Sequence, residues 1–120
     1  MIVARGWLRT EGLAIGLAGL AAAWWLGAPF WPALAVLVAP DIAIAAYAIG
    51  PRPGALAYNA AHSYVGPAVA AVLLVTSGAA PEVAGLCAVW AAHIGLDRAL
   101  GYGLKGADFK DTHLGRIGRG

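Results

Sequence analysis

Long apolar runs separated by short turn-forming segments set the pattern of this chain. No charged residue occurs between Gly12 and Pro40, and a chain of this size could not bury that stretch on every side in water. Glycine and proline clusters interrupt the apolar pattern at three places, leaving pieces of roughly the 20 residues that cross a bilayer. The pattern predicts a four-helix transmembrane bundle, with helices at about residues 7–26, 31–49, 55–77 and 81–102.

Composition supports a membrane protein with one domain. Of the 120 residues, 61% are hydrophobic and only 12% are charged, unlike a soluble globular protein. We expect residues 1–104 to form the all-α bundle and residues 105–120 to form a short basic cytoplasmic tail. The net charge of +2 indicates no nucleic-acid partner, and the single cysteine, Cys87, excludes a disulfide framework.

The basic residues predict the orientation of the bundle. If the four segments all cross the membrane, every Lys and Arg falls on the same side of it: Arg5, Arg9, Arg52, Arg98, Lys105, Lys110, Arg116 and Arg119. The positive-inside rule assigns that side to the cytoplasm. Both termini are therefore predicted to be cytoplasmic, in a multi-pass protein of the cytoplasmic (inner) membrane.

Small residues recur at helical spacing in the first and fourth predicted helices. Gly12 and Gly16 are four apart, and Gly85 is followed by Ala88 and Ala92. Such positions allow two helix backbones to approach closely in a membrane. The sequence therefore predicts tight helix packing.

Ionisable residues inside the predicted spans are the main functional signal. Each is expensive in hydrocarbon, by roughly 2.5–3.5 kcal/mol for a charge at the centre, so these residues should face the bundle interior. At roughly 1.5 Å per residue they lie in one layer on the cytoplasmic side. The residues are Glu11, Asp41, His62, His93 and Asp97.

These residues fit two kinds of chemistry and one structural role. Neutral imidazoles and carboxylates suit zinc, iron or manganese, so His62, His93, Asp41 and Asp97 are candidate ligands of a divalent metal. The same four residues, with Glu11, could instead act catalytically by moving protons. A third interpretation is a polar network that only fixes the helix register.

Other polar residues lie beside the histidines along the chain. Tyr58 and Asn59 precede His62 by four and three residues and share a helix face with it. Tyr64 follows His62 closely, and Arg98 follows Asp97. We interpret Tyr58, Asn59, Tyr64 and Arg98 as candidate substrate-binding residues.

Several sequence stretches together resemble a known family. They cover nearly the whole chain: Leu8–Gly12, Ala39–Asp41, Gly50–Gly54, Tyr58–Tyr64, Ala92–Arg98, Gly101–Lys105 and Phe109–Gly118. In these stretches the chain resembles the small bacterial integral-membrane proteins catalogued as domain of unknown function 4260. The resemblance implies a bacterial four-helix membrane protein and implies no particular activity.

Three functional hypotheses remain open at this stage. The first is a membrane enzyme that uses a metal or acid–base chemistry on a lipid-soluble substrate. The second is a small ion-coupled transporter in which Glu11 and Asp41 exchange protons. The third is a non-catalytic accessory subunit. The expected partners are the lipid bilayer and either a second copy of the chain or a larger membrane complex.

Overall fold

The computed structural model describes residues 2–105, which form helices and turns with no strand in that range. The predicted all-α class is thereby confirmed, whereas the predicted tail beyond Lys105 lies outside the described residues. The helices are α1 (Ile2–Trp25), α2 (Phe30–Val38), the 3-10 helix η1 (Ala39–Ala48), α3 (Pro51–His62), α4 (Val65–Thr76) and α5 (Pro81–Leu100).

Two of the predicted helices are interrupted, each near a proline. Pro40 stands where α2 gives way to the ten-residue η1. Pro67 lies in the first turn of α4, because a helix continuing through it would bring its ring against the carbonyl of Ser63. Ser63 is extended, and α3 and α4 meet at 51° instead of forming the expected single helix.

Within residues 2–105, the number of candidate membrane spans is smaller than the sequence predicted. By length and composition, the α2–η1 segment Phe30–Ala48 and helix α5 could each cross a membrane. The bent pair of α3 and α4 makes a third span if it is counted as one. Helix α1, which carries Arg5, Arg9 and Glu11, is not among them. The four-span bundle and its cytoplasmic termini therefore stay predictions.

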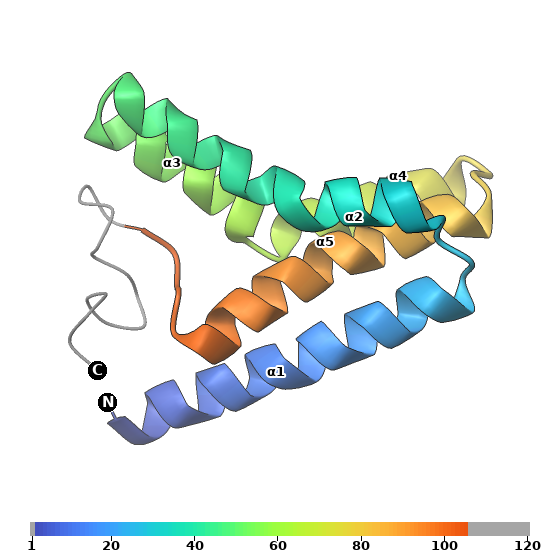
Figure 1. The fold of residues 1–120 in the computed structure, drawn as a ribbon, viewed down its shortest axis with the longest axis horizontal. Helices are drawn as coiled ribbons and strands as arrows, with labels where there is room; N and C mark the ends of the chain where they lie inside the picture. The colour runs from blue at the N-terminus through green and yellow to red at the C-terminus, as the bar shows by residue number, and fades with distance from the viewer. Residues whose placement is uncertain (1, 106–120) are drawn as a thin grey trace.

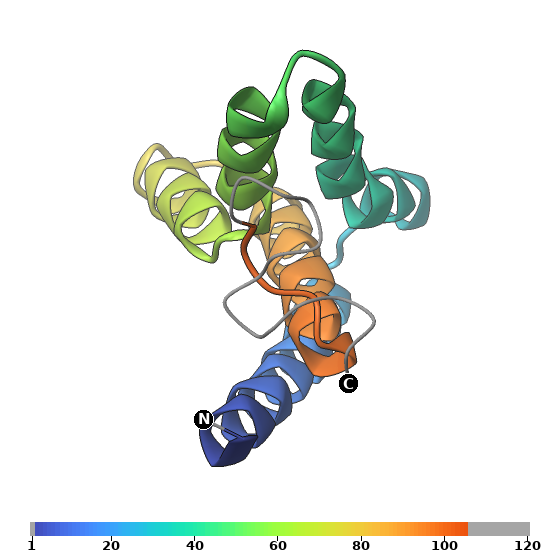
Figure 2. The same cartoon turned by 90° about the vertical axis from the view of Figure 1, so that its left-hand side faces the viewer.

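Helix α5 lies at the centre of the fold. Figure 1 shows it running between α1 on one side and the α2, η1, α3 and α4 segments on the other, and Figure 2 shows the same order from the end. Consequently α5 has two covered faces. One packs on α1, and the other carries the polar side chains described below.

Glycine brings α1 and α5 into backbone contact. A Cβ added at Gly95 of α5 would lie 2.5 Å from the carbonyl oxygen of Gly12 in α1. A Cβ added at Gly19 would lie 2.7 Å from the carbonyl oxygen of Ala88. These spacings agree with the predicted tight packing, because only residues without a side chain let the two backbones come this close.

Burial is reversed relative to a water-soluble protein. The side chains of Trp24, Trp25 and Trp31 are 88%, 87% and 74% exposed, whereas His62 is fully buried. Two further polar residues, His93 and Arg98, are also buried. Apolar side chains on the outside and polar ones inside are what a lipid environment favours.

Candidate metal centre

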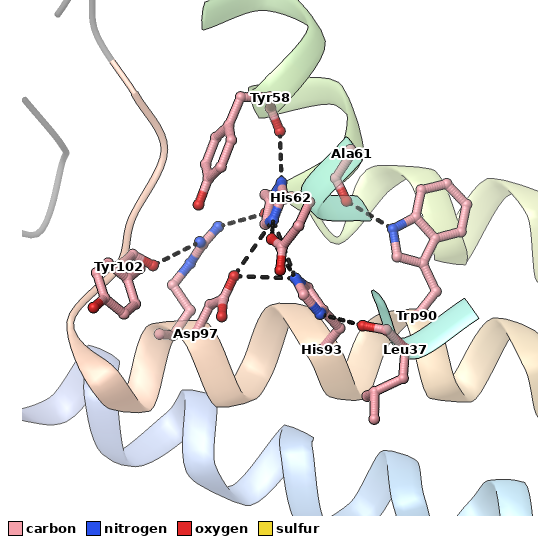
Figure 3. A network of polar contacts seen from close by, with 10 residues as sticks. Leu37, Tyr58, Ala61, His62, Trp90, His93, Asp97 and Tyr102 are labelled. Carbon is pink, nitrogen blue, oxygen red and sulfur yellow. Dashed lines mark hydrogen bonds and ion pairs between the residues drawn. The ribbon is translucent and has the colours of Figure 1, made fainter. Parts of the chain in front are cut away.

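Three separate segments bring four polar side chains to one point. His62 is the last residue of α3, Asp41 lies in the first turn of η1, and His93 and Asp97 lie one turn apart on α5. Figure 3 shows His62, His93 and Asp97 converging. One ligand atom from each of the four residues lies within 4.8 Å of the others, so the four predicted metal ligands come together.

The distances within this cluster match a tetrahedral metal site. The Nε2 atom of His62 lies 3.1 Å from Nε2 of His93 and 3.1 Å from Oδ1 of Asp41. It lies 3.4 Å from Oδ2 of Asp97, and Nε2 of His93 lies 3.2 Å from each of the same carboxylate oxygens. Metal bonds of about 2.05 Å in a tetrahedron give ligand separations of roughly 3.3 Å. Five of the six separations therefore fit such a site without rearrangement.

Backbone carbonyls fix which ring nitrogen of each histidine carries its proton. The Nδ1 atom of His62 lies 3.0 Å from the carbonyl oxygen of Tyr58, and Nδ1 of His93 contacts the carbonyl oxygen of Leu37. A carbonyl oxygen only accepts, so both Nδ1 atoms donate. In the neutral rings, both Nε2 atoms are therefore unprotonated and present lone pairs to the centre.

With both rings neutral, the centre gathers four acceptor atoms, and none of these four residues of the described range brings a donor to it. Two ring nitrogens and two carboxylate oxygens face one another at contact distance, which is repulsive unless a cation lies between them. A metal ion or shared protons would supply that positive charge. The arrangement is open on one side, because the Asp41 side chain is 54% exposed while that of Asp97 is 18% exposed.

The acceptor for His93 depends on the change of helix type at Pro40. In a 3-10 helix each carbonyl accepts from the N–H three residues later, and for Leu37 that residue is Pro40, which has no N–H. The Leu37 carbonyl is then available to the imidazole of His93. The proline therefore leaves an acceptor for a candidate metal ligand that lies in another helix.

Arg98 holds the backbone of His62. Its Nη2 atom donates to the carbonyl oxygen of His62 at 3.0 Å, and its Nη1 atom donates to that of Tyr102 at 3.4 Å. The carbonyl of His62 stands at the C-terminal end of α3, where partial negative charge gathers, and Tyr102 lies two residues beyond the end of α5. Helix α5 thus supplies two candidate ligands and, through Arg98, the position of a third.

A second support lies on the other side of His62. The ring of Tyr58 stacks flat on the His62 imidazole, with centroids 3.8 Å apart and planes at 5°. The ammonium of Lys105 lies 4.9 Å from the Tyr58 ring centroid. Burial lowers the pKa of Lys105, and the charge of Asp97 opposes that shift. The amide of Asn59 bonds the backbone of Lys105 in both directions, at 2.6 and 2.9 Å.

The remaining residues named from the sequence have different positions. Glu11 is exposed on α1 and does not belong to the four-residue group. Tyr58 stacks on His62, and Asn59 forms hydrogen bonds with Lys105, as described above. Tyr64 and Arg98 lie together, with the guanidinium 5.6 Å from the Tyr64 ring centroid.

Two contacts around the centre were absent from the sequence interpretation. The first is the carbonyl of Leu37, three residues before Pro40, which accepts from Nδ1 of His93. The indole of Trp90 donates to the carbonyl of Ala61 at 2.7 Å, beside the end of α3. Backbone acceptors carry no side-chain signature, and only Pro40, through its missing N–H, gave a hint of the first contact.

Comparison with known proteins identifies the family. No curated protein and no solved structure matches the chain. A family model, described as Domain of unknown function (DUF4260), matches residues 5–117 and therefore covers helices α1 to α5 and all four residues of the centre. The chain belongs to the DUF4260 family.

Proposed function

We propose that this chain is an integral-membrane metalloprotein that binds one divalent transition-metal ion and uses it on an amphipathic substrate. The ligands are Asp41, His62, His93 and Asp97, and zinc is the first choice of ion, ahead of iron and manganese. The proposal includes the predicted setting, the cytoplasmic side of a bacterial inner membrane.

The main support for the proposal is the convergence of four acceptor atoms at one point. In each of the two histidines, a backbone carbonyl outside the cluster holds the proton on Nδ1. Both imidazoles are held with Nε2 inward by the Leu37 and Tyr58 carbonyls. Two aspartates and a divalent ion sum to zero charge, which suits a low-dielectric interior. A set of two nitrogens and two oxygens is a common donor set for zinc.

The membrane setting draws support from two features. Two segments are long and apolar enough to cross a bilayer, and the bent α3 and α4 pair makes a third if counted as one. Large apolar side chains point outward, while the candidate ligands His62 and His93 are buried. A soluble protein would instead cover its apolar surface and hydrate its histidines.

The open side of the centre indicates how a substrate would reach it. Asp41 is the most exposed ligand, and it lies on η1 rather than on the more buried α5. A bound ion would supply Lewis-acid activation of water or of a substrate oxygen. The two buried imidazoles would hold the ion in place, and the substrate would approach past Asp41.

The competing interpretation is a metal-free proton network. In that case one proton would be shared between the two Nε2 atoms, or each ring would donate to a carboxylate, with no requirement for metal. The two interpretations differ in composition, since only one of them predicts metal in the purified protein. They also differ in how stability responds to added ions.

Elemental analysis of protein purified in detergent tests the proposal. We expect about one equivalent of zinc, iron or manganese per chain, and loss of the metal in His62→Ala and in Asp97→Asn. Glu11→Gln is the matched control, since it removes a carboxylate charge outside the cluster and should leave the metal content unchanged. Cobalt substitution should produce the intense visible absorption of a four-coordinate ion.

One result would refute the metal hypothesis. If wild-type protein contains no metal, and if none of the three ions raises its thermal stability, the cluster is not a metal centre. Retention of full metal content in both ligand variants would be equally contrary to it.

A further inference from the structure

Arg98 has a buried charge with unused hydrogen-bonding capacity. The residue is 7% exposed, and no carboxylate among residues 2–105 forms an ion pair with it. The two carbonyl contacts described above occupy two N–H groups of a guanidinium that carries five. Such carbonyls stabilise the charge in part, but they carry only partial negative charge.

Tyr64 presents a second unused donor beside Arg98. Its hydroxyl is buried and has no hydrogen-bond partner within the described part of the chain. The guanidinium of Arg98 lies over its ring, 5.6 Å from the centroid. Buried hydroxyl groups are normally paired, so an unpaired one calls for an explanation.

The charge balance around the centre favours an anion. With a divalent ion bound, the charges of Asp41 and Asp97 are neutralised, and Arg98 is left as an adjacent buried cation. A buried cation without a counter-ion is unfavourable, whereas a guanidinium binds phosphate oxygens through paired N–H groups. A tyrosine hydroxyl donates to the same kind of oxygen.

We propose that Arg98 and Tyr64 form a binding site for a phosphate group of the substrate, next to the metal centre. This inference rests on the proposed function, because it assigns the substrate class of that centre. Of the four residues predicted to bind substrate, Tyr58 and Asn59 are engaged within the fold. Arg98 and Tyr64 are the pair with donors to offer.

A substitution of Glu11 provides a test in which phosphate affinity should rise instead of fall. Glu11 is exposed on α1, and the next residue, Gly12, packs against Arg98, since a Cβ added at Gly12 would lie 2.3 Å from the Cβ of Arg98. A negative charge near the site weakens phosphate binding. Removing it should therefore increase affinity, an effect that loss of structure could not produce.

Two phosphate sources distinguish a lipid from a soluble ligand. The full chain, loaded with manganese, is measured with inorganic phosphate by the broadening of the phosphorus NMR signal. The same protein is measured by native mass spectrometry from nanodiscs of phosphatidylcholine with or without phosphatidic acid. Phosphatidic acid adducts alone indicate a lipid substrate, and binding of both probes indicates recognition of the phosphate group itself.

Variants connect the binding to the two residues. We expect Tyr64→Phe and Arg98→Lys each to weaken phosphate binding about tenfold or more, and Glu11→Gln to strengthen it. Tyr47→Phe removes a buried hydroxyl on η1, outside the proposed site, and is the matched control, with unchanged binding. Metal content is measured in each variant and should stay at the wild-type value in Tyr64→Phe.

The outcomes separate this inference from the metal proposal. Metal-loaded wild-type protein that binds neither probe, or binding that survives both Tyr64→Phe and Arg98→Lys, would overturn the phosphate site and leave the metal centre standing. Phosphate binding that depends on Arg98 and Tyr64 in protein that never acquires metal would support the site and refute the metal proposal.

Discussion

The two faces of α5 are built in opposite ways. Toward α1, Gly95 lets two backbones touch, and Arg9 of α1 donates from Nε to the carbonyl oxygen of Ala99 at 2.9 Å. Toward η1 and α3, His93 and Asp97 hold polar atoms against one another at 3.2 Å, in a centre that is partly open. One face therefore contributes close packing, and the other carries two of the candidate metal ligands. Stability and metal binding should be separable along this one helix.

The largest expected effect comes from filling the glycine contact. Gly95→Ala places a methyl group 2.5 Å from the Gly12 carbonyl oxygen and 2.6 Å from the Gly16 nitrogen, both backbone atoms. We expect a loss of about 3 kcal/mol in the free energy of unfolding, at the upper end for overpacking. Gly6→Ala is the control, because nothing lies within 4 Å of its added Cβ. It should stabilise α1 by up to about 1 kcal/mol, as glycine is a poor helix former.

Unfolding in mixed micelles, followed by circular dichroism, measures both changes. Equal effects of the two substitutions would mean that α1 and α5 do not pack closely, and the contrast between the faces would fail.

Metal binding should stabilise the folded protein through residues of the polar face alone. At a free metal concentration of 100 times the dissociation constant, linkage predicts about 2.7 kcal/mol of added stability. The increment should vanish when His62 and His93 are both changed to alanine. It should persist in Gly95→Ala, because the three atoms nearest the added methyl group belong to Gly12 and Gly16 of α1 and not to the four candidate ligands. Thermal melts with metal and with chelator check this, and loss of the increment in Gly95→Ala would show that the two faces are coupled.

The sequence predicted the ends of the helical segments better than the breaks within them. Glycine and proline clusters at residues 27–32, 50–54 and 77–81 marked the ends of the helical segments, and the boundaries of α5 were close to those observed. The break after His62 was not predicted, although Pro67 carried the signal. Hydropathy alone averages over such breaks, since α3 and α4 are apolar enough for a membrane span when they are taken together.

The next smaller effect concerns Pro40, which connects helix type to the metal centre. Pro40→Ala restores an N–H that competes with His93 for the Leu37 carbonyl. We expect metal affinity to fall about 10-fold or more, as for other groups that orient a ligand, with little change in the stability of the metal-free protein. Pro32→Ala is the control, because Pro32 lies in the first turn of α2, where its missing N–H leaves no bond unmade. Competitive chelator titration compares the two, and similar affinities in both variants would remove the proposed role of Pro40.

The sequence predicted the residues of the candidate site, but it did not predict the contacts that hold them in place. Helical spacing and depth singled out His62, His93, Asp41 and Asp97, because ionisable groups in apolar helices are few and must meet. The same reasoning included Glu11, which the fold places on the outside of α1. Depth alone does not specify which way a helix faces. The packing of Gly12 against α5 decides that direction, and it requires the three-dimensional structure.

The smallest effect is expected at the edge of the polar face, where Asn59 holds the segment after α5. Its amide donates to the Lys105 carbonyl and accepts from the Lys105 N–H, as a neighbouring strand would. Asn59→Ala removes both bonds, each of which contributes about 1 kcal/mol. Cleavage by trypsin after Lys105 should then accelerate roughly tenfold, since local opening exposes that bond to the protease. Cleavage after the exposed Arg9, which is followed by Thr10 on α1, is the internal reference in the same sample and should not change. If both sites accelerate together, the substitution has loosened the whole fold. If neither does, the two hydrogen bonds do not restrain the chain, and the support of Tyr58 by Lys105 would not depend on Asn59.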